Sequence, residues 1–504
     1  MELRYVAGMK RVSLVAVLAV VACGDDGTTS NSATQGQTTG VTTSPLPTTG
    51  TSVPTSSATE LDSDAGTMGA TGGQTTTGGA TTGGQTTTTG DISATGAMTT
   101  TTGGVMTTGG STSTGADTTT GDMTTGNCQP GDTDTMGDVV KSYLWVANSD
   151  EGSVSKVDTQ AVVEVGRYRT GPLGGDYAEN PSRTAVSYDG RFVVVHGRQS
   201  GRSTVVAANQ EDCVDANGNG TIETSANKDD LRAWGTDECV VWSIVHPFNN
   251  DIGGGPRGTT WSPGVFNKDT CQFEHPVVWV GYLPPQAATA HFVRLDGASG
   301  ALEETVVINN WVVGDTSWGP YGAALDKNLD VWFTGLRGEL FRVNTGMNPA
   351  TFDRWVPQNF LQMYGMTVDP DGDPWFGPNC GEITTFDPVN EQFIGVPGTD
   401  ACHRGLAADK EGAIWVADNS QCGVWQVDHK TNTLIQFHPL NPCSTPVGVS
   451  TDDEGFVWVV DEGGWVWKID PLNPMMKTML MVTGDHYTYS DMTGGQIKSV
   501  IQPQ

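Results

Sequence analysis

The chain has 504 residues and a formal net charge of −31 at pH 7. A protein this acidic repels phosphate backbones, so nucleic acid is not an expected partner. Residues 24–126 consist almost entirely of Thr, Gly, Ser and Ala and contain no aromatic residue. Such a stretch cannot bury enough apolar surface to offset chain entropy, which excludes one folded domain over the full length.

The first 22 residues have the pattern of a signal peptide. Basic residues precede an apolar run over residues 12–21, which is too short to span a membrane. Ala22 and Cys23 follow, an ending that resembles a bacterial lipoprotein box, in which the Cys thiol receives diacylglycerol. We expect lipidation of Cys23 and attachment to a bacterial envelope membrane, either periplasmic or surface-exposed on the outer membrane. The alternative is an ordinary secretory signal with a chance cysteine.

Residues 23–127 are expected to be the lipidated Cys23 and a disordered linker. Repeats of Thr-Thr-Gly behave as a flexible coil, and about 100 residues give a root-mean-square reach of about 55 Å. We interpret the linker as a stalk that holds a folded domain, residues 128–504, away from the membrane.

The cysteine count agrees with export. Nine cysteines less Cys23 leave an even number, which in an exported domain indicates disulfides. Eight cysteines allow 105 pairings, and proximity favours Cys213–Cys239, Cys380–Cys402 and Cys422–Cys443, leaving Cys128 for Cys271.

An internal repeat is the strongest structural signal. Four segments align without a gap, each with Gly and Trp ten residues apart: Gly322 to Trp332, Gly365 to Trp375, Gly405 to Trp415 and Gly448 to Trp458. Their Trp residues are separated by 43, 40 and 43 positions. Short alternating strands bounded by Gly and Asp turns at this period predict four-stranded propeller blades.

Upstream the repeat is less regular, but it still permits a count. We predict an all-β domain with seven blades, at about 142–175, 180–247, 252–312, 318–357, 362–398, 402–439 and 443–483; six blades are the alternative. The first blade lacks its inner strand, which the run Tyr489 to Gly494 is expected to supply, closing the ring and removing exposed sheet edges.

The repeats resemble NHL-type and virginiamycin B lyase (streptogramin lyase) propellers. The resemblance is carried by Gly319 to Gly322 with Val331 to Thr334, and by Arg404-Gly405 with Trp415 to Asp418, over about the last 190 residues. It indicates a type of blade, because a fold by itself does not define an activity.

Residues just before each aligned Gly are expected at one mouth of the central channel. They include Arg257, Tyr321, Tyr364, His403 and Arg404. Two arginines, two tyrosines and a histidine form a candidate pocket for an anionic or polar ligand. The alternative is that these side chains simply fill the channel.

The lyase resemblance implies a His base with a second His or acid and a bound magnesium ion. His403 is the candidate base and the only His that the alignment places in the ring; Arg404 stands where a lyase-like His is expected. A single titratable group without a partner is an incomplete catalytic set.

An insertion at about residues 209–239 contains a loop like the first half of an EF-hand. Its expected calcium ligands are Asp215, Asn217, Asn219 and Thr221, with Glu223 as the fifth. Position 12, usually Glu, is Ala226, so the loop must borrow a ligand from Glu223, Asp229 or Asp230. We predict a structural calcium ion; the alternative is a cluster of Asn-Gly turns.

The function predicted from these features is that of an envelope-anchored binding module. Its expected partners are the membrane, through the lipid on Cys23, and a protein, glycan or small molecule at the channel mouth or insertion. A carbon–oxygen lyase resembling streptogramin lyase is the alternative.

Overall fold

The computed structural model describes residues 142–173, 177–311, 318–336, 338–359 and 361–501. The chain divides into two units, Met1–Ser113 and Thr114–Gln504, and every described residue belongs to the second. Cys23, Cys128 and the predicted stalk lie outside the described residues. No helix in the described ranges is both long and apolar enough to cross a membrane.

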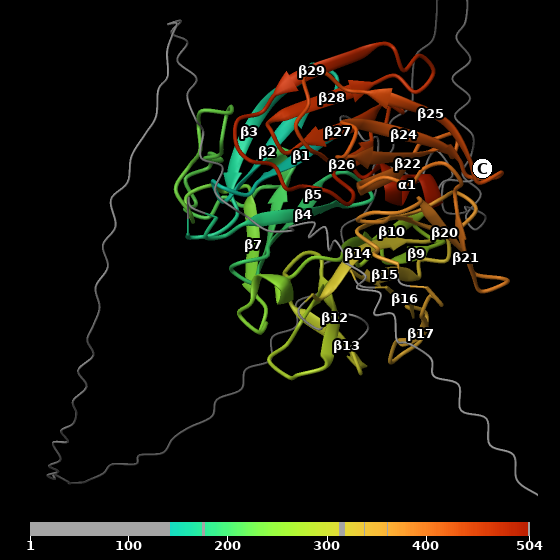
Figure 1. Ribbon diagram of the computed structural model, residues 1–504. Helices are drawn as coiled ribbons and strands as arrows, with labels where there is room; N and C mark the ends of the chain where they lie inside the picture. Colours follow the sequence, from blue (N-terminus) through green and yellow to red (C-terminus); the bar gives the residue numbers. More distant parts are fainter. Residues whose placement is uncertain (1–141, 174–176, 312–317, 337, 360, 502–504) are drawn as a thin grey trace, which may run out of the picture. The chain divides into compact units, whose positions relative to one another are not determined.

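The described residues form a β-propeller with seven blades (Figure 1). Blade 1 contains β1 (Tyr143–Asn148), β2 (Ser153–Asp158) and β3 (Val163–Arg169). Blade 2 contains β4 (Pro181–Val186), β5 (Phe192–Gly197), β6 (Arg202–Ala207) and β7 (Val240–Val245). Blade 3 contains β8 (Thr259–Ser262), β11 (Val277–Tyr282), β12 (Thr289–Asp296) and β13 (Leu302–Asn309). Blade 4 contains β14 (Pro320–Leu325), β15 (Val331–Gly335), β16 (Glu339–Asn344) and β17 (Thr351–Trp355).

The last three blades are equally regular. Blade 5 contains β18 (Gly365–Val368), β19 (Pro374–Gly377), β20 (Thr384–Asp387) and β21 (Gln392–Gly395). Blade 6 contains β22 (His403–Ala408), β23 (Ile414–Asp418), β24 (Gly423–Asp428) and β25 (Thr433–Pro439). Blade 7 contains β26 (Pro446–Thr451), β27 (Val457–Asp461), β28 (Trp465–Ile469) and β29 (Lys477–Met481). The prediction of seven blades is confirmed, and the six-blade alternative is wrong.

Two insertions interrupt the regular pattern. The extra residues of blade 3 form a hairpin of β9 (Val265–Asn267) and β10 (Gln272–Glu274) between β8 and β11. The insertion of blade 2 lies between β6 and β7 and begins with the 3-10 helix η1 (Gln210–Asp212). A second short helix, η2 (Ile252–Gly254), leads into blade 3.

The C-terminal segment completes blade 1 and closes the ring. The backbone N–H of Trp145 donates to the carbonyl of Met492 (2.9 Å), and Asn148 forms an antiparallel bridge with His486. The predicted inner strand is therefore present, although its pairing begins at residue 485, earlier than expected, where Ser149 N–H donates to the Asp485 carbonyl (2.8 Å). Figure 1 shows β1 to β3 beside β27 to β29.

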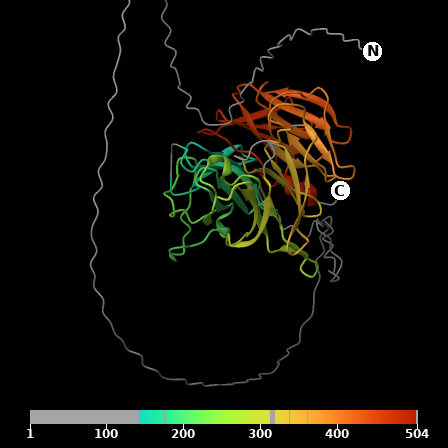
Figure 2. The same ribbon diagram turned by 60° about the horizontal axis from the view of Figure 1, so that its bottom comes forward.

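A helix that the sequence did not reveal follows this closing strand. Helix α1 (Gly495–Ile501) packs against β14, β18, β22 and β26, and Ile497 is 1% exposed. The side-chain amide of Gln496 donates to the carbonyl of Leu325, at the end of β14 (2.9 Å). In Figure 2 the red C-terminal segment lies among the yellow and orange blades. Helix α1 therefore fills the channel at the ends of the inner strands.

Three of the four expected disulfides are present: Cys213–Cys239, Cys380–Cys402 and Cys422–Cys443. Cys271 is also disulfide-bonded. Cys380–Cys402 links blade 5 to blade 6, and Cys422–Cys443 links blade 6 to blade 7.

Candidate functional site

The beginnings of the inner strands aim side chains into the channel. In β14 and β22 the pairing with the next strand shifts register, between Pro320 and Ala323 and between His403 and Leu406. A bulge of this kind redirects a side chain from its regular alternation. Tyr321 lies inside the first bulge and Arg404 inside the second. The two residues therefore occupy equivalent positions in their blades, as the sequence alignment indicated.

Tyrosines fill the channel at this level. Tyr321, Tyr364 and Tyr489 are each at most 1% exposed. The Tyr321 and Tyr364 ring centroids are 5.1 Å apart, and those of Tyr364 and Tyr489 are 5.2 Å apart. Tyr487 completes the cluster, with its hydroxyl 3.2 Å from the Tyr321 hydroxyl. The two predicted tyrosines are thus brought together, but as packed side chains that pave the base of the mouth.

Four arginines surround the tyrosine cluster. The guanidinium carbon of Arg257 is 5.3 Å from the Tyr321 ring centroid, and that of Arg404 is 4.6 Å from the Tyr364 ring centroid. Sequence analysis missed the other two. Arg183 lies 3.0 Å from the Tyr489 ring centroid, and Arg198 lies 4.1 Å from that of Tyr487. Contacts of this kind are cation–π interactions.

The missed residues left only weak signals in the sequence. Tyr489 begins the segment that was expected to close the ring, and Tyr487, two residues before that segment, points the same way because side chains of a strand alternate. Arg183 stands one residue beyond Ser182, the aligned position of blade 2, and the register shift between Pro181 and Arg183 cannot be read from an alignment.

His403 is buried away from the mouth surface. It is 0% exposed, and its ring Nε2–H donates to the carbonyl of Thr399 (2.7 Å). Burial lowers the pKa of His403, against the opposing effects of the Thr399 carbonyl and Asp418. The ring is therefore neutral near pH 7 and held by the backbone.

The prediction that His403 is the only ring histidine is wrong. His486 pairs with Asn148 as His403 pairs with Asp418, and its Nε2 also contacts a carbonyl four residues earlier, that of Val482 (2.8 Å). It is 0% exposed, and burial lowers its pKa. Because the same bond recurs at the starts of two inner strands, it is a feature of blade construction.

The rim of the mouth is polar and partly open. Arg404 is half-buried, and its guanidinium contacts the side-chain and backbone oxygens of Asn379. Burial and the neighbouring Asp485 raise the pKa of Glu462, although Arg404 and Arg198 act against this shift. Half-buried groups of both signs, Arg404 and Glu462, therefore stand beside a buried cationic and aromatic base.

The insertion brings most of the predicted calcium ligands together. The Asp215 carboxylate accepts the backbone N–H groups of Gly218 (2.7 Å) and Gly220 (2.8 Å). The Glu223 carboxylate meets the side-chain amides of Asn217 (2.7 Å) and Asn219 (2.8 Å). These bonds lower the pKa of Glu223, with the Asn219 contact as the largest cause.

The three candidates for the ligand missing at position 12 of the loop lie in different places. Glu223 reaches the loop, whereas Asp229 pairs with Lys228 (2.7 Å) and Asp230 accepts the backbone N–H of Ala226 (3.0 Å). Glu238, which sequence analysis missed, accepts the N–H groups of Ala216 (2.9 Å) and Glu223 (2.8 Å) and is 7% exposed. Its carboxylate adds a further hard oxygen donor beside the loop.

A second group of possible metal ligands lies on blade 3. One ligand atom each from His275, Asp296 and Glu303 lie within 4.8 Å of one another. His275 Nε2 contacts Glu303 (2.6 Å), and Arg294 pairs with the same carboxylate (2.9 Å). Arg294 therefore already forms an ion pair with one of the three possible ligands.

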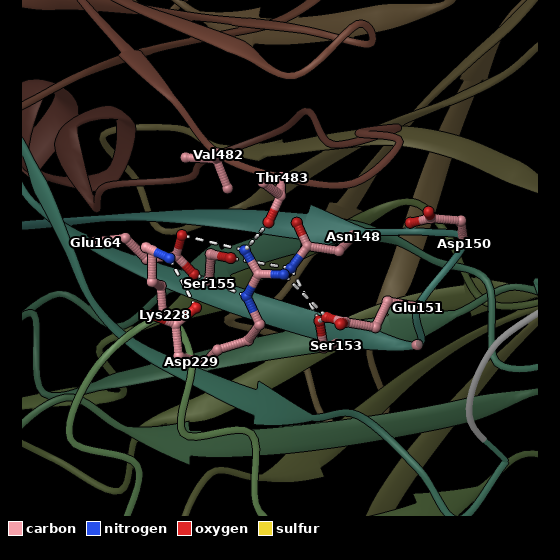
Figure 3. A network of polar contacts seen from close by, with 12 residues as sticks. Asn148, Asp150, Glu151, Ser153, Ser155, Glu164, Lys228, Asp229, Val482 and Thr483 are labelled. Carbon is pink, nitrogen blue, oxygen red and sulfur yellow. Dashed lines mark hydrogen bonds and ion pairs between the residues drawn. The ribbon is translucent and has the colours of Figure 1, made fainter.

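Blade 1 shows how this fold accommodates a buried arginine. Arg167 on β3 is 4% exposed, and its guanidinium binds both oxygens of Glu164 (2.8 and 3.1 Å) and one of Glu151 (3.2 Å). Burial would lower the pKa of Arg167, but these two carboxylates raise it. Figure 3 shows Glu151, Glu164 and Thr483 around this network.

No protein-family model matches the chain, and no curated protein matches its sequence. Solved structures with a similar fold include AztD from Citrobacter koseri, at 12% identity and a TM-score of 0.43, covering 71% of this chain and 99% of that chain. Virginiamycin B lyase from Staphylococcus aureus with quinupristin has 12% identity and a TM-score of 0.41, covering 60% and 84%. A streptogramin B lyase structure has 18% identity and a TM-score of 0.36, covering 47% and 71%. Likenesses of this degree carry no information about ligand or activity.

Proposed function

We propose that this protein is a binding module whose ligand enters at the mouth formed by the starts of the inner strands. The observation that carries the proposal is the combination of a rigid tyrosine base with partly open charged groups, Arg404 and Glu462, on the rim. Helix α1 fills the opposite end, so the channel offers one entrance. Concave sites with a few convergent polar groups are typical of small-molecule binding.

The lyase alternative requires a base that substrate can reach. His403 is 0% exposed and its Nε2 proton is engaged by the Thr399 carbonyl. A general base must lie within hydrogen-bond reach of the proton that it removes. This burial favours binding over turnover. Cleavage of a cyclic lactone by the wild-type protein, lost in His403→Gln, would contradict the proposal.

A thermal-shift screen of small acids, oligosaccharides and peptides tests the binding function. We expect at least one compound class to raise the melting temperature, and Arg404→Gln to weaken its binding about tenfold or more, because a charged hydrogen bond is lost. Arg191→Gln, on the exposed surface of blade 2, is the control. A screen without hits, or equal binding by Arg404→Gln, counts against a ligand site at the mouth.

We also propose that the chain is anchored to the bacterial envelope through a lipid on Cys23, with residues 23–127 as the stalk. The support is the sequence pattern at residues 12–23. Labelled fatty acid fed to a bacterial host should enter the wild-type protein and not Cys23→Ala, which should fractionate away from membranes. Equal fractionation of the two proteins would contradict the anchor.

A structural calcium ion in the blade 2 insertion is a further proposal. Its support is the meeting of Asp215, Asn217, Asn219 and Glu223, with Glu238 alongside. Calcium supplied to chelator-treated protein should raise the melting temperature of the wild type and not of Asp215→Ala, while Asp229→Asn should respond like the wild type. No response in the wild type would remove the proposal.

A further inference from the structure

Two fully buried arginines face the tyrosine cluster without a carboxylate. Arg183 on β4 and Arg257 just before β8 are each 0% exposed. Among the described residues, no Asp or Glu oxygen lies within 4.0 Å of either guanidinium. Arg167, which is equally inaccessible, has two carboxylates. Arg183 and Arg257 therefore differ from Arg167, whose buried charge is paired with carboxylates.

The hydrogen bonds of the two guanidiniums are incomplete. Among the described residues, Arg183 has only long contacts, from Nη1 to the Ser490 hydroxyl (3.4 Å) and from Nη2 to the Tyr364 carbonyl (3.3 Å), and its Nε has no partner there. Arg257 uses Nη1 for the carbonyls of Ile252 and Gly253, while its Nε and Nη2 have no partner in the part of the chain that the structure describes. Buried charged donors without partners are costly, so these two groups call for an explanation, and a ligand that accepts their hydrogen bonds is one.

The unpartnered donors gather around one ring. The guanidinium carbons of Arg183 and Arg257 lie 4.8 and 5.3 Å from the centroid of Tyr321. The hydroxyl of Tyr489, which stacks below Arg183, also has no partner. Burial lowers the pKa of Arg183, against the opposing effects of Tyr489, Tyr321 and Tyr364, and the positive charge of Arg257 adds a smaller lowering effect. Both guanidiniums therefore lie against the same tyrosine ring, with tyrosines as their charge-stabilising neighbours.

We propose that Arg183 and Arg257 together bind an oxyanion in the channel, such as the carboxylate, sulfate or phosphate group of a ligand. A planar guanidinium presents parallel N–H donors that match two oxygens of such a group. The Tyr489 hydroxyl supplies a neutral donor at the same place. This inference rests on the proposed binding function and names the chemical class of its ligand.

In this proposal the oxyanion enters past the charged rim. Helix α1 fills the other end of the channel, whereas Arg198 and Arg404 stand at the mouth. Arg198 is 5% exposed and its Nη1 also has no partner. A descending series of cations attracts an anion inward, even though the chain as a whole carries a net charge of −31.

The test measures the binding of sulfate, phosphate and acetate to protein freed of these ions by dialysis, with chloride at matched ionic strength as the comparison. At least one oxyanion should raise the melting temperature by about 2 °C or more in a saturable way, because a ligand that binds only the folded state stabilises it. Labelled sulfate or phosphate in equilibrium dialysis gives the affinity without unfolding the protein.

Arg183→Gln and Arg257→Gln should each weaken oxyanion binding about tenfold or more, and Arg191→Gln should not. If either channel variant fails to fold, Arg183→Lys and Arg257→Lys keep the charge but remove the fork, and should still weaken binding. An equal effect of chloride, no saturable effect in the wild type, or unchanged binding in folded variants overturns the proposal. Loss of the mouth ligand in Arg404→Gln with oxyanion binding intact separates the two functions.

Discussion

At the scale of single residues, one hydrogen bond repeats through the four regular blades. The indole N–H of each central Trp donates to an Asp carboxylate six residues earlier. The pairs are Trp332 with Asp326 (3.0 Å), Trp375 with Asp369 (2.9 Å), Trp415 with Asp409 (2.8 Å) and Trp458 with Asp452 (2.8 Å). The other oxygen of each Asp accepts backbone N–H groups of the turn. The repeat Gly-x3-Asp-x5-Trp therefore holds the turn between the first two strands of each of these blades.

Removing one such lock should cost stability. Asp409 is 3% exposed and accepts from Trp415 and from the backbone of Glu411 and Ala413. Asp409→Ala leaves these buried donors without a partner, and we expect a loss of about 2 kcal/mol or more in the free energy of unfolding. Glu411→Ala, exposed in the same turn, is the control. Denaturant titration measures both, and equal stability of the two variants would contradict this role.

The acidic turn of blade 5 should make stability depend on pH. Burial, and then the charges of Asp369, Asp387 and Asp371, raise the pKa of Asp373 from 3.8 to about 6. A carboxyl group whose pKa is higher in the folded state favours folding when protonated. Its contribution is therefore full below about pH 4 and is lost as the pH rises through about 6.

Asp373→Asn should therefore raise the melting temperature at pH 7.5 and leave it unchanged near pH 4, relative to the wild type. Asp269→Asn, in an exposed turn of blade 3, should change neither value. Melting curves between pH 4 and 7.5 give the comparison. If the difference in melting temperature between Asp373→Asn and the wild type does not grow with pH, the raised pKa of Asp373 is refuted.

At the scale of elements, the C-terminal segment 485–501 has two separate structural roles. The stretch 485–492 is the inner strand of blade 1, and α1 fills the channel end. The strand was predictable because β1 matches the second strand of the other blades. Blade 1 therefore needs an inner strand from elsewhere in the chain to cover the exposed edge of its sheet. The helix was not, because residues 495–501 are too short a segment for a periodic apolar pattern to stand out.

The packing of α1 predicts a large loss of stability when one buried apolar side chain is truncated. Ile497 is 1% exposed among the inner strands, so Ile497→Ala leaves a cavity and should lower the free energy of unfolding by about 2–4 kcal/mol. Ser499→Ala, in the same helix and half-buried, should change it by about 0.5 kcal/mol or less. Similar losses in both would mean that the helix contributes through its backbone alone.

At the scale of the whole molecule, neighbouring blades are held together covalently as well as by packing. Cys380–Cys402 joins blade 5 to blade 6, and Cys422–Cys443 joins blade 6 to blade 7. The closing strand joins blade 7 to blade 1. These links run along one continuous arc of the ring, from blade 5 through blades 6 and 7 to blade 1.

Loss of one link should be measurable in the intact protein. The Cys380–Cys402 bridge spans 22 residues, and the double variant Cys380→Ser with Cys402→Ser should lose about 3 kcal/mol of stability through the greater entropy of the unfolded chain. The effect should vanish when variant and wild type are compared under reducing conditions. A difference that persists in reductant would point to lost packing at these positions.

The site was only partly predictable, for a reason visible in particular residues. Alignment brought Tyr321, Tyr364 and Arg404 to equivalent positions, and the structure gathers them. It could not show that the tyrosines pack tightly, because packing depends on distances across the ring. Nor could it find Arg183, whose direction is set by a register shift at the start of β4.

The sequence by itself determined the blade repeat, the number of blades, the closing strand and three disulfide pairs, because each depends on local patterns or on spacing along the chain. Only the tertiary structure shows how the channel is packed: α1 lies at one end, four tyrosines pack in the middle, and among the described residues neither Arg183 nor Arg257 is paired with a carboxylate. These residues come from different blades and from the C-terminal segment. Their meeting depends on ring closure, and no pattern within a single repeat records it.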